Sequence, residues 1–223
     1  MTKISKGDFI EIEYTGRVKE NGIIFDTTDG KLAKENELHG HDFGPVVICV
    51  GEGHVLPGID KNLEGKEAGK NYELSVNPED AFGSKSAKLI QLIPTNKFKR
   101  QNIQPMPGMQ LNIDGMMGIV KTVSGGRTLV DFNHPLAGKE LLYKVNINKK
   151  VTDDGEKLQN LVKLSLGIKD FETDIKEGNA TISLKAALPK QAAEEIGSKI
   201  TELIPGIKKA EFVARKEQKQ HKQ

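Results

Sequence analysis

The sequence contains no tryptophan, a single cysteine and few aromatic residues. Only 5% of the 223 residues are aromatic, so a hydrophobic core must consist mainly of isoleucine, valine and leucine side chains. Because Cys49 has no second cysteine to pair with, the chain cannot form an intramolecular disulfide. We therefore expect a protein of a reducing compartment.

Long apolar runs and an excess of one charge are also missing. The longest run, Val46–Val50, falls far short of the roughly 20 residues that span a bilayer, and the first residues lack the apolar segment of a secretory signal. The 33 basic and 31 acidic residues almost cancel. We expect a soluble, cytoplasmic protein with no membrane partner and no dedicated nucleic-acid site.

The first segment has the alternation of a half-buried strand. Ile10, Ile12 and Tyr14 fall on one side of it, with polar residues between them. Asn21-Gly22 predicts a hairpin turn, and a second strand is expected over 22–27.

The next segment predicts a loop, a helix and two strands. Residues 28–44 are polar without sustained periodicity, which favours a long loop. Strands are expected at 46–50 and 70–76. Between them, residues 56–65 place Leu56, Ile59 and Leu63 on one face of a short amphipathic helix.

Composition changes twice in the remaining chain. Residues 84–134 hold four of the five methionines, and we expect a small β-rich unit with a helix near 95–99, followed by a strand over 141–148. Beyond Lys150 the pattern predicts a helix ended by Gly167, a hairpin over 171–186, a helix over 189–204 and a strand over 210–215. These elements make an α+β domain.

Short motifs in a fixed order carry a resemblance to a known family. They are YTGRV at 14–18 followed by IFDTT, VGEGHVLPGIDKNLEGKEAGK at 50–70, NPEDAFG at 77–83 and NHPLAGKELLYKV at 133–145. In order and spacing they resemble the FKBP family of peptidyl-prolyl isomerases. NHPLAGK is similar to the SlyD-like branch, in which the flap carries an inserted domain, and the extra C-terminal domain resembles the long archaeal form.

The resemblance implies an α+β fold, with an FKBP-like antiparallel β-sheet wrapped on a short helix. It also implies four segments along the chain. We expect the catalytic domain at 1–84, an insert-in-flap chaperone-like domain at 85–134, the last catalytic strand at 135–151, and a C-terminal α+β domain with a basic tail at 152–223.

The implied reaction is rotation about an X–Pro bond, whose barrier is roughly 18–20 kcal/mol. An apolar pocket that removes water from the planar, more dipolar amide favours the twisted state, so no cofactor or metal is expected. In the family, the backbone N–H at the position of Leu56 binds the substrate carbonyl, and Tyr14 and Asp26 are expected to pair. The implied catalytic pocket comprises Tyr14, Phe25, Asp26, Val46, Ile48, Val55, Leu56, Ile59, Phe82 and Tyr143.

Two pocket positions depart from the best-known members, and several residues have a simpler interpretation. Ile59 stands where a tryptophan is common, and Phe82 replaces a tyrosine that binds ligands through its hydroxyl. Without the resemblance, the pocket aromatics would be ordinary core residues and Asp26 a turn residue. His39–Asp42 favours a solvated loop over a metal site, and Cys49 a small buried apolar residue.

In the inserted domain, flexible apolar side chains are candidates for binding unfolded chains. Alternatively, about half of them fill the core of the small domain itself. The candidates are Ile90, Leu92, Phe98, Met106, Met109, Met116 and Met117.

These observations leave three functional hypotheses. The first is an isomerase acting on unfolded or nascent polypeptides that contain proline, with chaperone activity from the insert. The second is a holdase chaperone with a weak or vestigial isomerase pocket. The third adds a homodimer or ribosome contact through the C-terminal domain, whose basic residues over 208–222 otherwise form a solvating tail.

Overall fold

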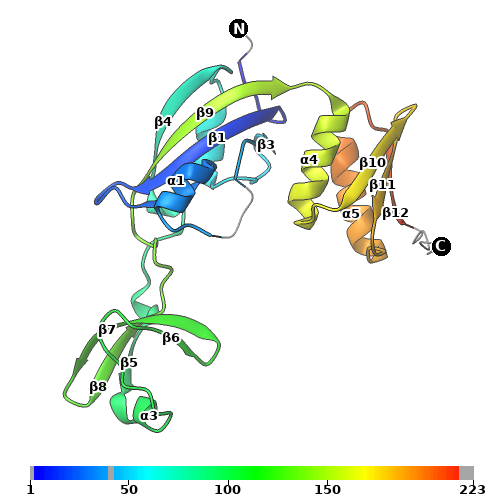
Figure 1. Ribbon diagram of the computed structural model, residues 1–223. Coiled ribbons are helices and arrows are strands. Elements are labelled where there is room, and N and C mark those ends of the chain that lie inside the picture. The colour runs from blue at the N-terminus through cyan, green and yellow to red at the C-terminus, as the bar shows by residue number, and fades with distance from the viewer. Residues whose placement is uncertain (1–2, 40–42, 216–223) are drawn as a thin grey trace, which may run out of the picture. The chain divides into compact units, whose positions relative to one another are not determined.

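The computed structural model describes residues 3–39 and 43–215, which form two compact units (Figure 1). The first unit comprises the described residues of 1–16, 24–74 and 143–223, and the second comprises 17–23 and 75–142. Together the units mix helices with sheets, which is the α+β class expected from the sequence.

The first unit is built on a five-stranded sheet. The strand order is β2-β1-β9-β4, and β3 pairs antiparallel with β1, so that Ile10 lies opposite Ile48. One short helix, α2 (Pro57–Leu63), buries Ile59 and Leu63. The strands are β1 (Phe9–Val18), β2 (Ile24–Thr27), β3 (Val46–Cys49), β4 (Lys70–Val76) and β9 (Leu141–Val151).

The long loop expected over 28–44 is partly wrong, because it contains the helix α1 (Gly30–Glu35). Asp29 caps this helix by accepting hydrogen bonds from the backbone N–H groups of Lys31 and Leu32, at 2.8 and 3.2 Å. With only Ala33 buried, the helix is too short to leave a 3.6-residue apolar period in the sequence.

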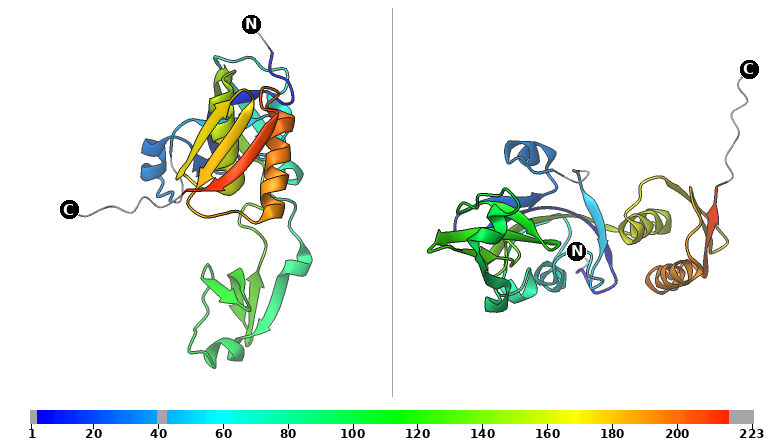
Figure 2. Two further views of the ribbon diagram at one scale, coloured as in Figure 1. Left: turned by 90° about the vertical axis from the view of Figure 1, so that its right-hand side faces the viewer. Right: turned by 90° about the horizontal axis from the view of Figure 1, so that it is seen from below.

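The C-terminal part of the first unit is a three-stranded sheet with two helices on one face (Figures 1 and 2). Its central strand pairs antiparallel with one neighbour and parallel with the other. Gly167 ends the first helix in the left-handed conformation, at φ 63°, as the sequence predicted. The elements are α4 (Asp154–Leu166), β10 (Phe171–Lys176), β11 (Asn179–Leu184), α5 (Lys190–Leu203) and β12 (Lys209–Ala214).

The second unit contains a four-stranded sheet in the order β5-β8-β7-β6. Phe98, Val120 and Val130 form its buried core. The helix expected near 95–99 is confirmed as α3 (Thr95–Lys99). The strands are β5 (Ile90–Pro94), β6 (Gln110–Ile113), β7 (Met116–Ser124) and β8 (Arg127–Asp131), and single 3-10 turns lie at Pro78–Asp80 and Ala87–Leu89.

Candidate active site

Three aromatic rings from different strands meet inside the first unit. The Tyr14 ring of β1 lies 5.9 Å from the Tyr143 ring of β9, centroid to centroid, at a tilt of 58°. The Phe25 ring of β2 meets Tyr143 edge-on, with centroids 5.8 Å apart and an angle of 85°. Both geometries are favourable for aromatic pairs, so the rings form a rigid apolar wall.

A glycine makes this close ring packing feasible. A Cβ atom at Gly16 would lie 2.7 Å from two carbons of the Tyr143 ring and 3.1 Å from the Phe25 ring. Such distances are too short for carbon atoms in contact. Gly16 in the YTGRV motif therefore leaves the room that the two rings occupy.

Tyr14 also supplies the polar edge of the site. Its hydroxyl donates a hydrogen bond to the Asp26 carboxylate, which is the expected pair. Burial, followed by the charge of Asp26 and this hydrogen bond, raises the pKa of Tyr14 to about 12. The phenol is therefore protonated at neutral pH and remains a donor.

A cavity of about 450 Å³ opens beside these side chains. Leu56 stands at the start of α2, where its carbonyl accepts from Ile59 and Asp60. Its backbone N–H donates to no acceptor within residues 3–39 and 43–215, as is usual before the first turn of a helix. The cavity is lined by Tyr14, Asp26, Gly53, His54, Val55, Leu56, Pro57, Ile59 and Tyr143.

The loop that leads into α2 is held from inside by a buried carboxylate. Asp60 is 7% exposed and accepts the backbone N–H groups of Gly51 and Gly53, at 2.8 and 3.0 Å. Both glycines have positive φ, of 87° and 68°, which suits a tight turn. Asp60 thereby sets the path of the chain just before Val55 and Leu56.

His54 ties the same loop to β3. Its Nδ1 accepts the backbone N–H of Cys49 at 3.0 Å. Burial, and then the positive charge of Lys199, lower the pKa of His54 from 6.5. The imidazole is therefore neutral at pH 7, with its proton on Nε2.

The cavity brings together six of the ten residues expected in the pocket. Of the others, Phe25 borders it through Tyr143, Ile48 is buried on β3 and Val46 is half-buried. Phe82 belongs to the second unit, where its ring stacks on His134 with centroids 4.4 Å apart. The catalytic roles of these residues stay predictions.

The sequence interpretation missed three residues that line the cavity. They lie inside the VGEGHVLPG motif, beside residues that were assigned, so the motif itself was the available signal. They are Gly53, His54 and Pro57.

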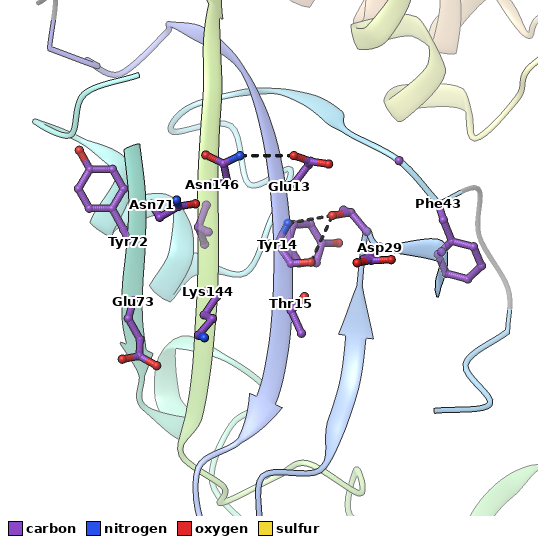
Figure 3. Close-up of a pocket in the computed structure, with 14 residues that line it drawn as sticks. Glu13, Tyr14, Thr15, Asp29, Phe43, Asn71, Tyr72, Glu73, Lys144 and Asn146 are labelled. Carbon is purple, nitrogen blue, oxygen red and sulfur yellow. Dashed lines mark hydrogen bonds between the residues drawn. The ribbon is translucent and has the colours of Figure 1, made fainter. Parts of the chain in front are cut away.

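The opposite face of the sheet carries a larger hollow of about 1030 Å³ (Figure 3). Glu13 and Thr15 of β1 alternate with Tyr14, and so they point away from the aromatic cluster. The Asn146 amide donates to Glu13 at 3.4 Å. With Glu73 and Lys144 also in its lining, this hollow is too polar to strip water from an X–Pro amide.

The inserted sheet exposes most of the apolar side chains that were candidates for substrate binding. Phe98 does not belong to the exposed substrate-binding candidates, because it is 4% exposed and lies in the insert's own core. Half-buried Met109 packs against that core. This is the alternative considered for part of the set. The exposed members are Ile90, Leu92, Met106, Met116 and Met117.

The C-terminal and metal predictions fall partly outside the described residues. Residues 40–42 of the His39–Asp42 segment and residues 216–223 of the basic tail are not described. Cys49, in contrast, is confirmed as a buried free thiol, and burial raises its pKa to about 12.

Comparisons with known proteins agree with this geometry. Residues 1–99 match the family described as FKBP-type peptidyl-prolyl cis-trans isomerase, and residues 91–136 match the FKBP26 IF domain. The short-type peptidyl-prolyl cis-trans isomerase of Methanocaldococcus jannaschii is 31% identical over 146 residues, covering 65% of this chain and 92% of that protein. The FKBP-type peptidyl-prolyl cis-trans isomerase SlyD of Haemophilus influenzae is 30% identical over 150 residues, covering 65% and 71%.

Proposed function

This chain belongs to the FKBP-type peptidyl-prolyl cis-trans isomerases, with the inserted domain of the SlyD-like members, and we propose that its pocket and its insert act together on unfolded or nascent polypeptides. The observation that carries the isomerase chemistry is the cavity beside the Tyr14, Phe25 and Tyr143 rings. The observation that carries substrate capture is an exposed apolar face on the inserted sheet.

The pocket catalyses rotation about the X–Pro bond in two ways: it removes water from the amide, and it offers one backbone N–H as a hydrogen-bond donor. When a prolyl ring packs against Ile59 and Tyr143, its amide loses contact with water. The loss of water destabilises the planar, more dipolar amide relative to the twisted amide. The backbone N–H of Leu56, at the edge of the cavity, would donate a hydrogen bond to the substrate carbonyl oxygen. No bond is broken and no proton is transferred, so the site requires no general acid or base.

The insert offers a row of apolar side chains across one face of its sheet. In the strand register, Ile90 and Leu92 of β5 share a face with Leu129 of β8 and with Ile119 and Met117 of β7. This face is the one opposite the core residues Val120 and Val130. Leu92 and Met117 are 54% and 58% exposed, which suits transient contact with unfolded chains.

The capture step can be tested by changing that face alone. We expect the double variant Leu92→Gln, Met117→Gln to slow the catalysed, proline-limited refolding of a model protein while leaving isomerisation of a short X–Pro peptide unchanged. The matched control is Leu164→Gln, which removes a similarly exposed side chain from α4 outside the insert. Equal refolding rates for the wild type and the double variant would rule out capture by this face.

A holdase with a vestigial pocket is the second candidate. It is favoured by Ile59 and Phe82, where family members carry tryptophan and tyrosine, and Phe82 stacks on His134. A holdase would suppress aggregation of unfolded protein without accelerating the proline-limited phase. Acceleration of that phase by the intact chain would exclude it.

We place this activity in the cytoplasm. The support is the single cysteine, which is buried and free, as is usual in a reducing compartment. None of the helices in the described part of the chain is long and apolar enough to cross a membrane. Fractionation of cells that produce the protein, followed by detection in the cytoplasmic fraction, would test the location.

A further inference from the structure

Strand β3 has a different neighbour on each of its faces. Ile48 is buried on the face that belongs to the isomerase fold. Val47 and Cys49 point the other way and lie in one continuous apolar cluster with Leu158 and Leu161 of α4. Figures 1 and 2 show α4 beside β3. The C-terminal domain therefore packs directly on the strand that precedes the pocket.

The chain that follows β3 forms a wall of the catalytic cavity. After Cys49 it turns through residues 50–53, which Asp60 holds from inside, and then supplies His54, Val55 and Leu56 to the cavity lining. The bond from the Cys49 N–H to His54 Nδ1 links the packed strand to this wall. A shift of β3 would thus be transmitted to Leu56 within a few residues.

The C-terminal domain also contacts the 50–56 loop through an ion pair. Lys199 of α5 forms an ion pair with Glu52 at 3.0 Å. The Glu52 side chain is 21% exposed and that of Lys199 41%, so the pair is partly screened by water. Beside Lys199 in sequence, Ile200 is fully buried in the shared apolar cluster, which fixes the direction of the helix.

We propose that the C-terminal domain is a positioning element for the isomerase site, which fixes the 50–56 loop through packing on β3 and through the Glu52–Lys199 ion pair. Glu52 and Lys199 act through the loop and touch no substrate. The inference rests on the isomerase activity and adds an intramolecular role for the domain. A change in this contact would tune turnover without altering the pocket's own side chains.

A charge-exchange experiment on the full chain tests the proposal. We expect Lys199→Glu and Glu52→Lys each to lower kcat/KM for a short X–Pro peptide by about two- to fivefold, because each replaces attraction by repulsion at the loop. The double variant Glu52→Lys, Lys199→Glu restores the pair in reverse and should recover the wild-type value. The matched control is Lys185→Glu, which breaks the Lys185–Asp170 pair elsewhere in the same domain and should leave kcat/KM unchanged.

The salt dependence of kcat/KM provides a second measurement, which a purely structural role of the domain would not affect. At about 1 M salt, screening should reduce the ratio of wild-type to Lys199→Glu kcat/KM toward one. Wild-type kcat/KM in both single variants, or losses that the exchange does not rescue, would overturn the proposal. An inactive wild type would instead contradict the isomerase function, so the two failures are distinguishable.

Discussion

The side chain of Tyr14 contributes both to the apolar wall of the site and to its polar edge. Its ring packs against Tyr143, which keeps the pocket apolar, while its hydroxyl binds Asp26 at the polar edge. The cavity is thus lined by aromatic and aliphatic side chains together with one carboxylate. This combination suits a reaction that depends on desolvation and orientation.

Removal of the Tyr14 hydroxyl should weaken catalysis without disturbing the ring cluster. We expect Tyr14→Phe to lower kcat/KM for an X–Pro peptide roughly two- to tenfold, which corresponds to the net value of one ordinary hydrogen bond, about 0.5–1.5 kcal/mol. Tyr72→Phe is the control, because its hydroxyl bonds the backbone of Glu67 away from the cavity. An unchanged kcat/KM in Tyr14→Phe would contradict a role for the Asp26 pair.

His54 should make stability depend on pH. Its pKa is lowered in the folded chain, so the unfolded chain binds the proton at higher pH, and stability rises with pH from the lowered pKa to 6.5. Lys199 opposes protonation, while Glu52 and Asp60 favour it. On acidification the stability contributed by neutral His54 is lost as the pH falls through its folded pKa.

We therefore compare thermal unfolding from about pH 7 to about pH 5 in the wild type and in His54→Gln. The glutamine carbonyl keeps an acceptor for the Cys49 N–H but does not titrate. The wild-type midpoint should fall more steeply with acidification than that of the variant. Parallel curves would show that His54 does not carry this dependence.

The sequence identified pocket residues better than it identified their supports. The motifs placed Tyr14, Leu56 and Ile59 because their spacing resembles that of a family. Asp60 and His54 were missed, because a carboxylate and an imidazole that bind backbone N–H groups look like ordinary loop and helix residues in sequence. Their function depends on a fold that brings the groups together.

At the scale of elements, helix α4 depends on a side-chain cap. Asp153 accepts the backbone N–H of Glu156 at 2.7 Å. We expect Asp153→Ala to lower the free energy of unfolding by about 1 kcal/mol and the midpoint of thermal unfolding by roughly 2–4 °C. Asp153→Ser should retain most of the stability, because serine also caps helices. Circular dichroism melts would measure the difference, and equal midpoints for alanine and serine would exclude the cap.

The inserted sheet depends on a glycine in β7. A Cβ at Gly118 would lie 2.5 Å from the Val130 side chain and 2.8 Å from the Phe132 ring. Gly118→Ala should therefore overpack the core of the insert and lower its free energy of unfolding by about 1–3 kcal/mol. We expect slower catalysis of protein refolding, with turnover of a short X–Pro peptide retained. Thr122→Ala, at an exposed position of the same strand, is the control. A native-like melt for Gly118→Ala would contradict this packing.

Element prediction succeeded where local signals were strong. The helix after Asp153, its end at Gly167 and the hairpin near Gly178 all follow from caps and turns that the sequence displays. Helix α1 was missed because its single buried residue, Ala33, gives no periodic pattern. The parallel pairing of β11 with β12 is set by the intervening helix α5 and could not be derived from either strand alone.

At the scale of the whole molecule, one chain carries an isomerase fold, an insert with an exposed apolar face, and a C-terminal domain that packs on the isomerase fold. The sequence indicated the first two through motifs and a methionine-rich segment. It did not indicate that Phe9, Val47 and Cys49 pack with the C-terminal domain, because apolar residues on the outer side of a strand do not specify what covers them.

Isomerisation of a short X–Pro peptide by the full chain is the direct test of catalysis at the cavity beside Tyr14 and Tyr143. Two-dimensional exchange NMR follows cis and trans peptide at equilibrium without a coupled reaction. With catalytic amounts of the protein, we expect exchange peaks to appear on a timescale well below the tens to hundreds of seconds of the uncatalysed reaction, and to weaken in Tyr14→Phe. Exchange no faster than in free solution would show that the chain does not catalyse X–Pro rotation.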